Sequence, residues 1–281
     1  SRDRKQQAIK IRAEFISPSE QADYHFEKGQ ASQINSKEAF NQFKIAADMG
    51  HLNGIMQVAY AFFHGLGVEQ SFEKAFDYFC KLASFNIDVV DYTIGICYSK
   101  GLGVAQSHEI AFGYFKKAAA VGSNEAQYML GCAYYHGLGI PRSEKNAILY
   151  LKKAASQDHD DALFNLGRIY DVKQDYQEAI KYYVLAIDLG NMEAYNNLGI
   201  LYEQGLGVEQ SFEKAFRNYK RAADAGVSHA QYNLALLYKD GRGTLQSDTE
   251  YLHYLTLAAQ SLPDAKFAIK LFIKSELTKI L

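Results

Sequence analysis

The side chains that could perform chemistry are scattered along this sequence. None of the eight histidines has the H-E-x-x-H spacing of a zinc-binding helix. The three cysteines, Cys80, Cys97 and Cys132, do not combine with histidines in a metal-ligand pattern. No nucleophile lies beside a base and an orienting group in a recognisable order. The sequence therefore predicts no catalytic residue, no metal and no cofactor.

Glycine-rich segments such as GLGV (65–68) are the other chemical candidates, because loops of this kind bind phosphate when they join a strand to a helix. Here the preceding residues have helical spacing, as in EAQYMLGCAYY (125–135). The first glycine of such a loop suits the left-handed conformation that ends a helix. We therefore interpret the loops as turns between helices.

These loops belong to an internal repeat. The segment GLGVEQSFEKAF occurs at 65–76 and again, unchanged, at 205–216. The first loop glycine recurs at steps of 36 residues, apart from one interval of 68 that fits one normal and one shortened unit. We expect seven units over residues 17–262, with the shortened one at 159–190. The glycines are Gly29, Gly65, Gly101, Gly137, Gly205 and Gly241.

A residue suited to N-capping follows each of these glycines six positions later. Its side-chain oxygen can accept a hydrogen bond from a free N–H group in the first turn of the next helix. Each unit is therefore predicted to be two helices joined by a turn. The predicted caps are Asn35, Ser71, Ser107, Ser143, Ser211 and Ser247, with Asp175 in the shortened unit.

The pattern A-x-x-x-L-G-x-x-Y-x-x-G-x-G-V, then A-x-x-Y-F-x-K-A-A-x-x-G, resembles the Sel-1-like repeat, a relative of the tetratricopeptide repeat. The resemblance covers nearly the whole chain, although Val58 and Ala59 replace Leu-Gly and the unit at 161–190 is more like a tetratricopeptide unit. It implies an all-α, right-handed superhelical solenoid of stacked antiparallel helix pairs that binds proteins. The clearest copy comprises Ala126, Leu130, Gly131, Tyr134, Gly137, Gly139, Ala147, Lys153, Ala154 and Ala155.

Repeat arrays need polar caps at their ends. Residues 1–16 are expected to form an N-terminal capping helix or linker. Residues 263–281 are expected to form a C-terminal capping helix with Ala265, Ile269 and Ile273 facing inward. The first residue is not Met, so we interpret the chain as a trimmed or excised piece whose targeting segment would be lost.

Composition excludes several classes of partner. The net charge of −2 gives no electrostatic footprint for nucleic acid. No apolar run approaches the roughly 20 residues of a membrane span, so we expect no membrane insertion. Unpaired cysteines favour a cytoplasmic setting, but the compartment remains open.

The strongest functional signal is a stripe along the first helix of each unit. Its members recur two residues before each Leu-Gly pair and then four and seven residues later, which keeps them on one helix face. The resemblance implies that this face lines a concave groove. It is aromatic and apolar in the early units and polar in later ones, where three asparagines lie directly before Leu-Gly or its equivalent. The candidate partner-binding residues are Met56, Tyr60, Phe63, Tyr92, Ile96, Tyr128, Tyr135, Phe164, Asn165, Arg168, Asn196, Asn197, Glu203, Tyr232 and Asn233.

Two interpretations of this stripe stay open. The large side chains either pack against neighbouring helices or receive a partner protein or peptide segment. The asparagines either bond an extended peptide or bridge helices. We predict a non-catalytic scaffold or adaptor. The alternatives are a regulatory module excised from a larger protein and a hydrolase of cell-wall or β-lactam-type substrates. A homodimer through a terminal repeat is a further possibility.

Overall fold

The chain folds into helices that follow one another in antiparallel hairpins. The computed structural model describes residues 17–33 and 36–280, with side chains up to residue 275, and all regular secondary structure in these ranges is helical. The described residues divide into two compact units, unit 1 up to residue 150 and unit 2 from residue 151. The predicted N-terminal cap at 1–16 and the predicted N-cap Asn35 lie outside the described residues.

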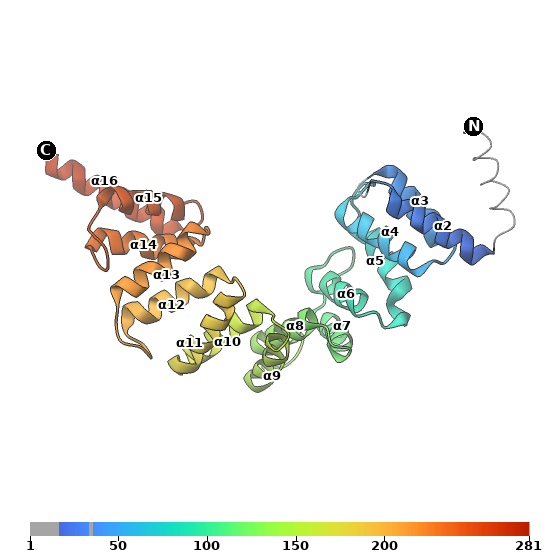
Figure 1. The fold of residues 1–281 in the computed structure, drawn as a ribbon, viewed down its shortest axis with the longest axis horizontal. Coiled ribbons are helices and arrows are strands. Elements are labelled where there is room, and N and C mark those ends of the chain that lie inside the picture. The colour runs from blue at the N-terminus through green and yellow to red at the C-terminus, as the bar shows by residue number, and fades with distance from the viewer. Residues whose placement is uncertain (1–16, 34–35, 281) are drawn as a thin grey trace. The chain divides into compact units, whose positions relative to one another are not determined.

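Unit 1 contains the first three helix pairs and most of the fourth, drawn blue to green in Figure 1. From α2 to α8, every helix contacts the next along the chain. The helices are α2 (Pro18–Ala31), α3 (Lys37–Asp48), α4 (Leu52–His64), α5 (Phe72–Leu82), the short η1 (Ala83–Phe85), α6 (Asp88–Lys100), α7 (His108–Ala120) and α8 (Asn124–His136), and α9 (Glu144–Ala155) crosses the division between the units.

Unit 2 contains three further pairs and a last, longer helix, drawn yellow to red in Figure 1. Each helix from α10 to α16 again contacts its successor. They are α10 (Asp160–Val172), α11 (Tyr176–Asp188), α12 (Met192–Gln204), α13 (Phe212–Asp224), α14 (Ser228–Asp240), α15 (Asp248–Ala258) and α16 (Pro263–Ile280).

The predicted helix ends are largely confirmed. The C-cap glycines that follow α4, α6, α8, α12 and α14 have φ between 66° and 74°, the left-handed conformation that glycine adopts at no steric cost. The predicted serine caps and Asp175 accept the backbone N–H three residues later. In α3 the cap is Ser36, which accepts from Ala39 at 3.1 Å.

Gly29 does not belong to this set of loop glycines, and its assignment from the sequence was wrong. It lies inside α2, where a Cβ would come within 2.6 Å of the Phe43 ring. Gly95 meets Phe115 at the same distance. Gly29 is therefore the close-contact residue between the two helices of its repeat. Its spacing of 36 from Gly65 is a coincidence, and the first repeat lacks the G-x-G turn.

The second loop glycine joins consecutive repeats. A Cβ on Gly103 would lie 2.2 Å from the carbonyl oxygen of Phe72, at the start of the preceding second helix. Gly243 has the same relation to Phe212, also at 2.2 Å. Because only glycine fits this close approach, the turn of each such repeat packs on the second helix of the one before. The repeated twelve-residue segment thus contains both contact partners, the glycine and the helix start.

The last helix, α16, packs against α15. Ala265 is fully buried as predicted, but Ile273 is 51% exposed, contrary to the prediction. Its neighbour Phe272 takes the inward place and meets Tyr251 edge-on at 5.4 Å. Lys270 occupies the position that holds Ala235 in α14, so no second helix could approach α16 as closely as α15 approaches α14.

Candidate interaction surface

We call the predicted stripe along the first helices the ladder. Its aromatic and apolar part lies in unit 1. All of its members in this unit are half-buried: part of each side chain packs inside the repeat and part is accessible. They lie on α4, α6 and α8, and are Met56, Tyr60, Phe63, Tyr92, Ile96, Tyr128 and Tyr135.

Ladder rings of α4 and α6 pack on the second helix of their own repeat. Tyr60 meets Phe79 edge-on at 5.4 Å, and Tyr92 meets Phe115 at 6.0 Å. Burial raises the pKa of Tyr60, while a hydrogen bond with Thr93 of the next repeat opposes that rise. Packing therefore covers part of Tyr60 and part of Tyr92, and the rest of each ring is accessible to a partner.

The ladder of unit 2 is less uniform in exposure. Phe164 and Asn196 are buried, whereas Arg168 is exposed and its guanidinium lies 5.9 Å from the Phe164 ring centre. Tyr232 is half-buried on α14. Of these four residues, Arg168 and Tyr232 offer the most surface to a partner, and Phe164 and Asn196 mainly support them.

A chain of hydrogen bonds links the ladder asparagines across repeats. Asn233 donates to the side-chain oxygen of Asn196 at 3.0 Å, and Asn196 donates to Asn197 at 3.2 Å. Asn197 in turn donates to the hydroxyl of Tyr183 at 3.2 Å. Asn165 is likewise engaged by neighbouring groups. These amides bridge helices, one of the two roles that the sequence left open.

Two buried tyrosines of unit 2 bond to carboxylates at the third ladder position. Tyr183 donates to Asp171 at 3.3 Å, and Tyr219 donates to Glu203 at 2.7 Å. Arg242 also donates to Glu203, at 3.0 Å. Burial raises the pKa of both tyrosines well above the ordinary value, so both hydroxyls are neutral donors at physiological pH.

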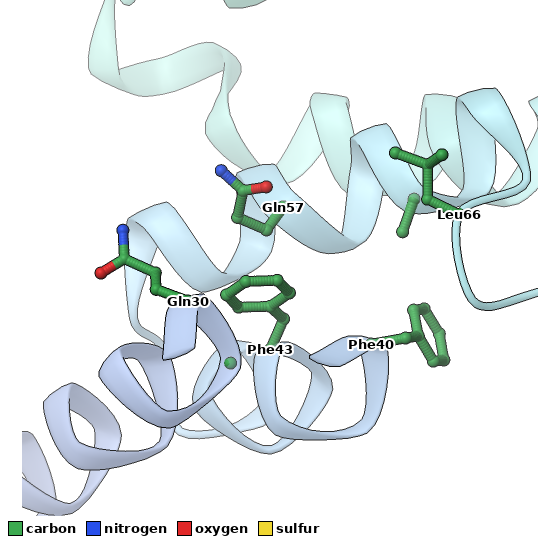
Figure 2. A pocket seen from close by; sticks show the side chains of 7 residues that line it. Gln30, Phe40, Phe43, Gln57 and Leu66 are labelled. Atoms are coloured by element: carbon green, nitrogen blue, oxygen red, sulfur yellow. The ribbon is translucent and has the colours of Figure 1, made fainter. Parts of the chain in front are cut away.

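A pocket in unit 1 contains residues that the sequence did not single out. Its volume is about 300 Å³, and it lies between the end of α2, α3 and the first helix of the next repeat. Figure 2 shows Gln30 and Gln57 on one side of the Phe43 ring, and Phe40 and Leu66 on the other. Correct placement of Gly29 would have revealed Gln30 as a ladder position.

A second pocket, of about 540 Å³, lies at the C-terminal end of unit 2. Tyr232 and Leu236 of α14 form one wall, and Phe267 and Leu271 of α16 form another. Phe267 and Leu271 are 63% and 52% exposed, respectively. Of the candidate residues in unit 2, Tyr232 is the one that lines this pocket.

One group of potential metal ligands occurs in the described part of the chain. The side chains of His159, Asp160 and Asp161 lie within 4.8 Å of one another at the start of α10. His159 caps the helix through Ala162, and Asn191 donates to both carboxylates at 3.3 Å. Carboxylates at a helix N-terminus are stabilised by the helix dipole, which accounts for this group without a metal.

The cysteines differ in accessibility. Cys80 is exposed and Cys97 is fully buried. Burial raises the pKa of Cys97 to about 11, so its thiol is neutral and unreactive at physiological pH.

No described helix is both long enough and apolar enough to cross a bilayer.

Stacked helix pairs joined by G-x-G turns define a protein of the helical-repeat class. The Sel1 repeat model matches seven segments, residues 22–51, 53–84, 92–123, 124–159, 160–191, 193–227 and 228–261, and the chain belongs to this family. The family consists of helical repeat modules that generally mediate protein interaction and are generally non-catalytic. The hydrolase alternative receives no support from these findings.

Solved structures share the fold. A Sel1 repeat protein from Oxalobacter formigenes is 28% identical, with a TM-score of 0.67, over 73% of this chain and 82% of the other. A protective antigen of uropathogenic Escherichia coli is 23% identical, with a TM-score of 0.58, over 92% of this chain and 65% of its own.

Among curated proteins, chitin synthase regulatory factor 2 of Schizosaccharomyces pombe is 42% identical over 53 residues. That match spans 19% of this chain and only 10% of the fission-yeast protein.

Proposed function

We propose that this protein is a non-catalytic scaffold or adaptor that binds another protein, or a peptide segment of one, through the ladder of its first helices. The half-buried rings of unit 1 carry this proposal. Tyr60, Phe63 and Tyr92 pack on the second helix of their own repeat and remain partly accessible, so little side-chain freedom is lost on binding. Tyrosine is well suited to such a surface because it combines a large ring with a polar hydroxyl.

The polar groups of unit 2 support a division of labour in this proposal. Arg168 and the accessible parts of the asparagine chain provide charge and hydrogen bonds beside an apolar ring. We infer that unit 1 contributes mainly affinity, and that unit 2 contributes specificity through groups whose geometry is already fixed.

The test is capture of a partner from host extract, followed by binding of that partner in purified form. The variant Tyr92→Ala/Tyr128→Ala/Tyr232→Ala should bind the purified partner at least 100-fold more weakly, since several interface anchors are lost together. Circular dichroism must first show that its helicity is unchanged.

The matched control removes exposed apolar side chains from second helices: Ile110→Ala/Leu149→Ala/Leu185→Ala. This control should bind within about threefold of the parent. Loss of binding in the control, with retention in the ladder variant, would place the interface on the second helices and refute the proposal.

A regulatory module within a longer chain is the second candidate. The match to a protein named as a regulatory factor of chitin synthase favours it, although that match covers little of either chain. If the captured partner is an enzyme, its activity should change on addition of this chain and stay unchanged with the ladder variant. If the activity is unaltered in both cases, the regulatory role is refuted and only the adaptor proposal stands.

A further inference from the structure

The pocket in unit 1 is a place where a side chain is missing. Gly29 packs on Phe43 as Gly95 packs on Phe115, which puts Gln30 at the ladder position that Ile96 occupies. The same register aligns Gln30 with Tyr60, the residue after Ala59. A polar, flexible side chain therefore takes the place of a ring.

The next repeat shows what fills this place. There, Tyr60 lies edge-on to Phe79 with ring centres 5.4 Å apart. Its hydroxyl lies close enough to Thr93 on the following first helix for that polar side chain to lower the pKa of Tyr60, which burial raises. By the same register Phe43 corresponds to Phe79, and Gln57 corresponds to Thr93. The first repeat thus has the aromatic wall and the polar end of this arrangement, but no tyrosine between them.

The shape and chemistry of the pocket agree with this description. It holds about 300 Å³, the lower end of the range for small-molecule sites. Phe43 and Ala61 are buried in its wall, and none of its seven lining residues is charged. Gln30 and Gln57 are both exposed at one side, where their amides can donate and accept.

We propose that this pocket binds a tyrosine side chain presented by a partner peptide. The ring packs against Phe43 as Tyr60 packs against Phe79, the hydroxyl bonds to the Gln57 amide, and Gln30 bonds to the main chain of the peptide. The proposal rests on the proposed function only in assuming that the partner is a protein. The uncharged walls disfavour an anionic or cationic side chain, because its charge would lose water without gaining a counter-charge.

The first experiment titrates N-acetyltyrosinamide into the full chain with methyl labels on alanine and leucine. Saturable shifts should centre on Ala61 and Leu66, with a dissociation constant of about 1 mM. N-acetylphenylalaninamide should bind about three- to tenfold more weakly, because the Gln57 amide then lacks a partner. Absence of saturation at about ten times that concentration, or shifts centred elsewhere, would refute the proposal.

The variant Gln30→Tyr fills the pocket from within. It should raise the melting temperature by about 2–4 °C and abolish the shifts at Ala61 and Leu66. The matched control Gln204→Tyr, at an exposed position at the end of α12, should change neither. Retention of N-acetyltyrosinamide binding in Gln30→Tyr at unchanged affinity would contradict the proposal, whatever its melting temperature.

The variant Gln57→Leu provides an independent readout if Gln30→Tyr folds poorly. It should remove the preference for the tyrosine amide over the phenylalanine amide while keeping the binding of both. A preserved preference would show that Gln57 does not contact the hydroxyl. These outcomes are separate from the proposed function, because a partner held by the ladder would still lose affinity with the Tyr92, Tyr128 and Tyr232 variant.

Discussion

The two units use different side chains at the same place between paired helices. In unit 1 the ring opposite the small residue of the first helix is Phe43, Phe79 or Phe115. In unit 2 it is Tyr183 or Tyr219 in two repeats. The close contact is the same, with a Cβ on Gly95 or Gly199 lying 2.6 Å from the ring.

The difference lies in what the added hydroxyl requires. A buried hydroxyl without a partner costs about 1–3 kcal/mol, so each tyrosine needs an acceptor on the adjacent helix. Asp171 and Glu203 are those acceptors, and both are ladder residues. In the repeat of unit 1 that contains Phe79, the third ladder position holds Phe63, which packs on Phe79 with ring centres 6.3 Å apart. The polarity of the ladder in unit 2 is thus set partly by its core.

Removal of Glu203 should break the polar arrangement most severely. Glu203→Ala leaves the Tyr219 hydroxyl without its acceptor and removes one carboxylate from Arg242, whose Nε is buried without a partner. We expect the free energy of unfolding in urea to fall by about 3 kcal/mol. The control Glu209→Ala, at an exposed site, should change it by less than about 0.5 kcal/mol. Equal effects of the two variants would show that the carboxylate is dispensable.

Introducing a buried tyrosine of the unit 2 kind into unit 1 should also lower the free energy of unfolding, unless a carboxylate partner is introduced with it. Phe79→Tyr buries a hydroxyl beside Phe63, and we expect a loss of about 2 kcal/mol in urea unfolding. In a chain that already carries Phe63→Glu, the same Phe79→Tyr substitution should cost at most half as much free energy of unfolding. A double-mutant cycle with no coupling would argue against a hydroxyl–carboxylate pair as a transferable feature.

The hydrogen bonds among the ladder asparagines should contribute less to the free energy of unfolding. Asn233→Leu removes the 3.0 Å hydrogen bond to Asn196 and leaves that buried amide with one partner fewer. The expected loss is about 1 kcal/mol in urea unfolding. If stability is unchanged but binding to the captured partner falls, the amide serves the ligand rather than the link between α12 and α14.

The cysteines can test whether the two units unfold separately, because all three lie in unit 1. With its pKa raised to about 11, Cys97 has only ~0.1% thiolate at pH 8, and it is fully buried. A thiol reagent at pH 8 should label Cys80 promptly and Cys97 only when unit 1 opens. If Glu203→Ala acts on unit 2 alone, the labelling of Cys97 should stay slow. Rapid labelling in that variant would mean that the units unfold together.

Raising the pH should destabilise unit 1 through the same thiol. The pKa of Cys97 is higher in the folded state than in the unfolded state, so the folded state is favoured while the thiol is protonated. The contribution of this thiol to the free energy of unfolding is therefore fully present below pH 9 and is lost as the pH rises towards about 11.

Much of the fold was predictable because local chemistry specifies it. Caps such as Ser71 and glycines such as Gly65 act within a few residues, so their spacing identified the helix ends. Gly29 was misassigned because two different uses of glycine happen to be separated by 36 residues, and only the contact with Phe43 distinguishes them.

The candidate site was less predictable. The ladder positions followed from helical spacing, but burial of Phe164 and Asn196 depends on neighbouring repeats. The pairing of Tyr219 with Glu203 joins residues on different helices, and no periodic pattern indicates it. The pocket beside Gln30 arises from a smaller side chain in one repeat, which only the correct register exposes.

The contact between each second loop glycine and the preceding helix start has a consequence for how such a chain can grow. One segment carries the glycine that packs backward and the helix start that the next glycine packs upon. A duplicated repeat would therefore arrive with both surfaces already matched to its neighbours, and no compensating change would be needed. The unchanged copies at 65–76 and 205–216 are what such duplication would leave behind.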